Sequence, residues 1–162
     1  MNEFAENRMN DDEKIDVAKE FLRRYKRQEN VIDWQKQRLN EMAEIAIESS
    51  PAPQDVRVQS SKLSDPTADA AVKIADVTNK IKAKLQEERA ILIEMYEEIT
   101  AALSLIEDPE EREILYDIYI KGATLTAAYL TWGIHPRTAA RRHRRALISL
   151  YDRLSKQNKN GA

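Results

Sequence analysis

Two long stretches of this chain contain neither proline nor glycine, and they set the strongest limit on its fold. They span residues 12–48 and 67–106. In each stretch apolar side chains recur at intervals of three and four residues, which places them on one face of an α-helix. A helix of about 40 residues is roughly 60 Å long. Because this length exceeds that of an ordinary globular helix, it is typical of a coiled-coil arm.

The apolar stripe of the first stretch is weaker in its middle, where Glu29 and Lys36 occupy two of its positions. Its apolar members are Ile15, Ala18, Leu22, Tyr25, Ile32, Leu39, Ala43 and Ala46. The second stripe consists of Ile74, Val77, Ile81, Leu85, Leu92, Met95, Ile99, Ala102 and Ile106. The simplest structure that buries both stripes is an antiparallel pair of helices. The apolar surface left over is a candidate for homodimer formation.

The segment between the two stretches, residues 49–66, interrupts the helical pattern. It holds three of the five prolines and five serines. This composition predicts an exposed connector that is long for a simple turn. Ser64 or Asp65 is expected to cap the second helix, with Pro66 in its first turn.

The chain after the second stretch begins with a clear helix start. Asp108 is expected to be the cap and Pro109 the first helical residue, and the acids that follow favour the positive end of the helix dipole. This helix should run to about Ile120. It should end at Gly122, because glycine adopts the left-handed conformation that terminates helices.

Two more helices are predicted beyond that point. The first runs from Thr124 or Leu125 to Trp132, a turn follows at Gly133, and the last helix covers residues 136–154. Two short helices joined by a tight glycine turn describe a helix-turn-helix. We therefore expect an all-α protein, with a long antiparallel hairpin arm followed by a three-helix domain.

The predicted domain organisation follows from these elements. Residues 1–107 form the hairpin arm with its Ser/Pro-rich connector, residues 108–156 form the helix-turn-helix domain, and residues 157–162 form a disordered tail.

Charge is divided unevenly along the chain. The net charge is −2, but residues 1–120 hold 17 Lys/Arg and 27 Asp/Glu (net −10), whereas residues 121–162 hold 9 and 1 (net +8). Such asymmetry indicates a basic module with an acidic partner, most often nucleic acid. The stretch 132–147 contains five arginines and both histidines.

The arginines of the last helix cluster on one side. At about 100° per residue, Arg137, Arg141, Arg144 and Arg145 lie within one arc, with Thr138 at its edge, opposite the apolar side. Guanidinium groups suit phosphates and the O6/N7 edge of guanine, and the start of a recognition helix meets base edges in the major groove. The predicted base-reading residues are His135, Arg137, Thr138 and Arg141. Arg144 and Arg145 are predicted phosphate contacts.

The segment TLTAAYLTWGIHPRTAARRHRRALISL, residues 124–150, resembles the −35-reading domain of primary-type sigma factors. It is still more similar to sigma-like late transcription regulators of Gram-positive phages, including the ArpU and RinA types. The similarity extends over residues 108–150. The resemblance implies binding of double-stranded promoter DNA through the last helix, together with contact to RNA polymerase. His135 stands where that family usually has serine or threonine.

Three alternatives compete with this interpretation. The arginines of the last helix can instead pair with acids of the N-terminal half, although no acid occurs between Pro136 and Asp152. A small terminase-like DNA-packaging protein also joins a helix-turn-helix to an oligomerising helical arm. A coiled-coil adaptor would bind an acidic protein with its basic end.

Other chemistry finds little support in the sequence. There is no cysteine, and His135 and His143 alone give no metal-ligand spacing, so no metal, cofactor or catalytic site is predicted. His143 is expected on the packed side of its helix. The acid pairs at 87–88, 97–98 and 110–111 are interpreted as solvated helix faces. Without an apolar run or signal peptide, a cytoplasmic, non-membrane and non-enzymatic protein is expected, associated with the host nucleoid when bound to DNA.

Overall fold

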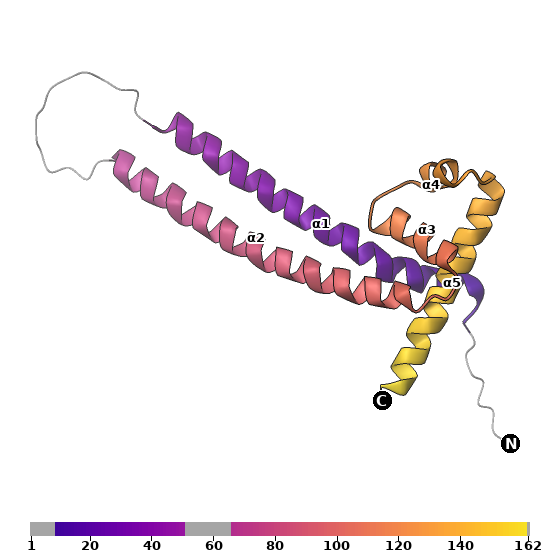
Figure 1. Cartoon of the computed structure of the whole chain (residues 1–162). Coiled ribbons are helices and arrows are strands. Elements are labelled where there is room, and N and C mark those ends of the chain that lie inside the picture. The colour runs from indigo at the N-terminus through magenta and orange to yellow at the C-terminus, as the bar shows by residue number, and fades with distance from the viewer. Residues whose placement is uncertain (1–8, 51–65, 162) are drawn as a thin grey trace, which may run out of the picture. The chain divides into compact units, whose positions relative to one another are not determined.

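The computed structural model describes residues 9–50 and 66–161, and these ranges contain helices and no strands (Figure 1). The helices are α1 (Asp11–Glu48), α2 (Pro66–Ser104), α3 (Pro109–Tyr119), α4 (Leu125–Trp132) and α5 (Pro136–Asn160). The all-α prediction is confirmed, with α1 and α2 forming a hairpin ahead of three shorter helices. The predicted connector lies outside the described residues except for its first two positions and Pro66.

The start of α1 is capped by side-chain hydrogen bonds, and both long helices continue without interruption. At the start of α1, the Glu13 backbone N–H donates to Asn10 Oδ1 at 2.9 Å, and the Asn10 N–H donates to Glu13 Oε2 at 2.8 Å. This reciprocal pair satisfies two N–H groups that the first turn leaves without helical partners. The prediction that 67–106 is one continuous helix is confirmed, with α2 ending two residues earlier, at Ser104.

The chain folds into two compact units, to which both long helices contribute. The five-helix unit comprises residues 1–28 and 92–162, and the two-helix unit comprises residues 29–91. The predicted domain boundary at 107/108 is therefore not a boundary between compact units. Instead, the start of α1 and the end of α2 join α3, α4 and α5 around one core.

That core explains why three short helices need the long ones. The start of α1 and the end of α2, with Ile106 just beyond it, contribute seven residues to the cluster that also buries the apolar sides of α3 and α5. Thirteen buried residues form a single cluster: Ile15, Ala18, Leu22, Ile99, Ala102, Leu103, Ile106, Ile114, Leu115, Ala128, Ala146, Leu147 and Leu150. The unit thus has a continuous hydrophobic core of the kind that stabilises an independent domain.

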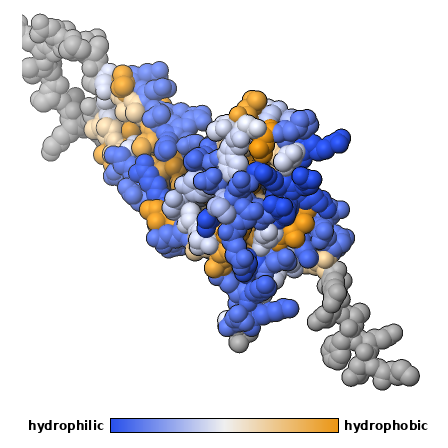
Figure 2. Space-filling view, turned by 45° about the vertical axis from the view of Figure 1, so that its right-hand side comes forward, coloured by the Kyte–Doolittle hydropathy of each residue, from blue (hydrophilic) through white to orange (hydrophobic). Residues whose placement is uncertain are grey.

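The two-helix unit is packed much more sparsely. Its buried residues are Ile32, Gln35, Ile81, Leu85 and Glu88, so two of five are polar. Within the described part of this unit, seven large apolar side chains are exposed: Val31, Trp34, Ile45, Ile47, Val72, Val77 and Ile91. Hydrophobic residues reach the surface in several separate places in the view of Figure 2. Ala43 and Val77 belong to the predicted apolar stripes but are exposed, so the prediction that they are buried is wrong. The polar residues Gln35 and Glu88 are buried instead.

The short helices follow their predicted caps closely. Asp108 caps α3 by accepting from the backbone N–H of Glu110 at 2.9 Å, and Thr124 caps α4 by accepting from that of Ala127 at 3.0 Å. The end of α5 differs from the prediction, because the helix runs on to Asn160. Residues 157–160 of the predicted disordered tail are therefore helical, since no proline or glycine occurs between Pro136 and Gly161 to stop the helix.

Candidate nucleic-acid interface

The turn between α4 and α5 fixes where the last helix begins. Gly133 has a φ of +64°, in the left-handed region that glycine adopts without steric cost. The Ile134 N–H donates to the Tyr129 carbonyl at 3.1 Å, and the Gly133 N–H to the Leu130 carbonyl at 3.3 Å. These bonds satisfy the last carbonyls of α4 and reverse the chain. The predicted turn at Gly133 is therefore present.

His135 starts α5 as its N-cap residue. Its backbone is extended (φ −67°, ψ 143°), and its ring nitrogen Nδ1 accepts the Arg137 backbone N–H at 3.2 Å. Pro136 occupies the first helical position, where its missing N–H is not needed. The His135 side chain remains exposed. His135 therefore caps the helix with one ring nitrogen, and the rest of its ring remains accessible.

The first two turns of α5 expose the arginines predicted to read bases. Arg137 and Arg141 are exposed and one helical turn apart. Neither forms an ion pair or a side-chain hydrogen bond with any residue in the described ranges. Thr138, at the edge of this face, is half-buried. Ala140 is also exposed beside these arginines, a position that charge patterns alone did not single out.

The later arginines of the helix are engaged by carboxylates. Arg144 Nη1 lies 2.8 Å from Asp12 Oδ1 in the first turn of α1. Arg145 Nε donates to Glu111, and its Nη2 lies 3.4 Å from Asp108 Oδ2. Both arginine side chains are still at least half exposed, at 52% and 60%. Arg144 and Arg145, the predicted phosphate contacts, therefore form the internal ion pairs that the alternative interpretation expects.

Two further arginines of α5 are paired in the same way. Arg142 Nη1 lies 2.5 Å from Glu110 Oε2, and Arg153 Nη2 lies 2.6 Å from Glu107 Oε1. The acids at 107–111 therefore form a row along α5. These pairs could not be predicted from the sequence, because Arg142 and Glu110, 32 positions apart, and Arg153 and Glu107, 46 apart, meet only after the chain folds.

Glu111 is the buried member of that acidic row. It is 5% exposed, and it accepts from Ser149 Oγ at 2.8 Å as well as from Arg145. The interpretation of the 110–111 pair as a solvated face is therefore wrong for Glu111, while Glu110 is exposed. The same correction applies to Glu88 of the 87–88 pair. The hydrogen bond that Arg145 donates to Glu111 holds the pKa of Arg145 above its ordinary value, so this guanidinium stays charged.

His143 lies on the packed side of α5, where it contacts α3. Its ring stacks on Tyr119 at a centroid distance of 5.9 Å and an angle of 19°, and its Nε2 lies 3.2 Å from the Tyr119 hydroxyl. Burial lowers the pKa of His143, with a smaller contribution from Lys19, and burial raises the pKa of Tyr119. Both groups are therefore neutral at pH 7.

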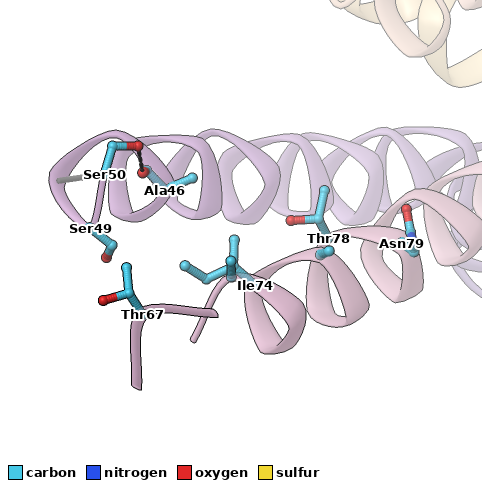
Figure 3. A pocket seen from close by; sticks show the side chains of 9 residues that line it. Ala46, Ser49, Ser50, Thr67, Ile74, Thr78 and Asn79 are labelled. Carbon is cyan, nitrogen blue, oxygen red and sulfur yellow. Dashed lines mark hydrogen bonds between the residues drawn. The ribbon is translucent and has the colours of Figure 1, made fainter. Parts of the chain in front are cut away.

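A pocket in the two-helix unit is lined by residues without charged side chains. It has a volume of about 410 Å³ and lies between the end of α1 and the start of α2 (Figure 3). Its lining is small and uncharged: Ala46, Ser49, Ser50, Thr67, Ala71, Ile74, Ala75, Thr78 and Asn79. Over the part of the chain that the structure describes, no group of three metal-ligating side chains occurs. Nor is any helix there long and apolar enough to cross a membrane.

Comparison of the chain with protein-family models, curated proteins and solved structures finds no match. The sigma-like resemblance of residues 108–150 therefore stays a prediction, and functional inference rests on the geometry of α5.

Proposed function

We propose that the five-helix unit binds double-stranded DNA sequence-specifically, as the DNA-binding part of a phage-type or prophage-type transcription regulator. The observation that supports this most is the pair Arg137 and Arg141. They are exposed, they have no ion-pair or hydrogen-bond partner for their side chains among the described residues, and they lie on the first two turns of a helix that follows a glycine turn. In helix-turn-helix proteins, that part of the second helix enters the major groove.

The contacts of α5 suggest a division of roles along it. His135, Arg137, Thr138 and Arg141 are proposed to face bases, because they occupy the start of the helix. Arg144 and Arg145 are proposed to contact phosphates by exchanging a carboxylate for a phosphate oxygen. Their remaining exposure permits this exchange, but the lost internal pair offsets part of each contact.

The remaining parts of the proposal concern partners and location. The resemblance to sigma-like regulators supports RNA polymerase as a second partner, and the exposed apolar residues of the two-helix unit support a homodimer. A cytoplasmic, non-enzymatic protein without a cofactor fits this role, with association to the nucleoid when DNA is bound.

Two other functions make different predictions. A DNA-packaging protein of the small terminase type would form rings of eight or more subunits, which sedimentation would detect. A coiled-coil adaptor would bind an acidic protein, and its affinity for DNA would be negligible even at low salt.

The proposal is tested by measuring affinity for duplex DNA over a range of salt concentrations. Replacing Arg137 and Arg141 together by alanine should weaken binding to a selected site more than binding to random duplexes, because both side chains are proposed to contact bases. The matched control is Lys156→Ala with Lys159→Ala, which removes the same charge from the far end of α5. Equal losses in both double variants would reduce the effect to net charge. Absence of salt-dependent binding by the wild-type chain would refute the proposal.

A further inference from the structure

The two ring nitrogens of His135 have different surroundings. Nδ1 accepts the Arg137 backbone N–H at 3.2 Å and so closes the first turn of α5. No described residue forms a hydrogen bond with Nε2 of this exposed ring. A cap interaction of this kind needs an unprotonated acceptor, because a protonated Nδ1 would direct its own hydrogen at the backbone N–H.

This arrangement fixes the tautomer of the neutral imidazole. With Nδ1 acting as the acceptor, the single ring hydrogen must lie on Nε2. The free nitrogen is therefore a hydrogen-bond donor and not an acceptor. On the major-groove edge of DNA, such a donor matches the N7 atom that both purines present, and it is repelled by the amino groups of cytosine and adenine.

We propose that His135 is a specificity-determining residue that donates from Nε2 to a purine N7 in the bound site. This inference rests on the proposed DNA-binding function and adds the class of atom that the residue recognises. The backbone N–H of Arg137 orients the ring for that contact, so capping and base recognition depend on the same side chain.

The first test examines the free protein. Nitrogen-15 NMR of the full chain, with His143→Phe to leave a single histidine signal, distinguishes the two neutral tautomers at pH 8. The expected result is a ring protonated on Nε2. Protonation on Nδ1 would overturn the inference whether or not the protein binds DNA.

The second test replaces the proposed acceptor. A bound site is first selected from random duplexes, and each purine in it is then exchanged for its 7-deaza analogue, which lacks only the N7 acceptor. At one position the exchange should weaken wild-type binding about three- to tenfold, the range expected for one hydrogen bond. The variant His135→Ser should show the same loss and be insensitive to the exchange at that position.

Serine is chosen because it is a good N-cap, so His135→Ser should keep the helix start. His135→Ala lacks a cap, and its lower thermal stability would measure the capping role alone. Arg141→Ala, the matched binding variant, should keep the sensitivity at the His135 position. Wild-type binding that no 7-deaza exchange weakens, or equal sensitivity in His135→Ser, would overturn the inference while leaving DNA binding intact. A wild-type chain without affinity for DNA would overturn the proposed function as well.

Discussion

The two units of this protein are built from the same two long helices, yet they differ in how they are stabilised. Among its described residues, the five-helix unit buries fourteen apolar side chains, thirteen of them in one cluster, and only two polar ones, Gln28 and Glu111. The described part of the two-helix unit buries three apolar residues and two polar ones, and it exposes seven large apolar side chains. A long amphipathic helix therefore does not guarantee a core. Burial depends on how many other elements surround it, and a lone pair of helices covers only one side of each.

The first prediction compares the same leucine-to-alanine substitution at two positions of α1, one in each unit. Leu22 is fully buried in the five-helix unit, whereas Leu39 is only half-buried in the two-helix unit. Leu22→Ala should lower the free energy of unfolding by about 2–5 kcal/mol, because it leaves a cavity, and Leu39→Ala by less than about 2 kcal/mol.

Chemical denaturation followed by tryptophan fluorescence measures both effects, since Trp132 lies in the five-helix unit and Trp34 in the two-helix unit. Trp34→Phe and Trp132→Phe backgrounds separate the two signals. Equal losses for the two leucine variants would mean that the units are stabilised alike.

The second prediction concerns two neighbouring carboxylates that hold α5 against α3. Glu111→Ala removes a buried carboxylate, so Ser149 loses its acceptor and Arg145 keeps only its contact with Asp108. The expected loss of unfolding free energy is about 1–3 kcal/mol. Glu110→Ala breaks only an exposed pair with Arg142, and should cost less than about 1 kcal/mol. A loss at Glu110 as large as at Glu111 would contradict the difference in burial.

These carboxylates also illustrate which features could be predicted from the sequence, such as helix starts, and which could not, such as ion pairs between distant residues. The helices and their starts depend on neighbouring residues, so Asp108, Thr124 and Gly133 were enough to predict α3, α4 and the turn before α5. The face of α5 that carries Arg137 and Arg141 followed from helical periodicity in the same way. Pairing of the later arginines was not predictable, because it depends on which acids lie across from them in the folded chain.

The domain boundary shows the same limit on a larger scale. Periodicity identified the stripes that contain Leu22 and Ile99, but it did not indicate which surface covers them. Both belong to the core that also contains Leu147, which lies more than a hundred residues from Leu22 in the sequence. Packing between segments that far apart is a property of the folded chain, so the boundary placed after residue 107 missed it.

The third prediction follows from the buried histidine of the five-helix unit. Because burial lowers the pKa of His143 in the folded state, the unfolded chain binds a proton first as the pH falls. The stability is therefore fully present above about pH 6.5, the ordinary histidine value, and is lost as the pH falls below it.

Unfolding free energies measured between pH 8 and pH 5 should show this loss in the wild type. His143→Phe should reduce the loss, since its ring cannot titrate. His135→Ser removes the exposed histidine and should retain most of it. A pH dependence unchanged by His143→Phe would refute the burial of His143 as its cause.

The smallest effect on stability is expected in the two-helix unit. Its exposed apolar side chains raise the question of whether a second copy of the chain covers them. Trp34 is 56% exposed and Ile47 is 74% exposed, so Trp34→Glu and Ile47→Glu should each change the free energy of unfolding by less than about 0.5 kcal/mol.

At about 100° per residue, Val31, Trp34 and Ile45 share one side of α1, and Ile47 lies on the other. Buried aromatic side chains often dominate the affinity of protein interfaces, which makes Trp34 the residue to change. If a second copy of the chain covers its side of α1, Trp34→Glu should lower the mass measured by sedimentation equilibrium, and Ile47→Glu should not. Equal masses for wild type and both variants, at a dimeric value, would place the interface elsewhere. A monomeric wild type at all concentrations would refute the proposed homodimer.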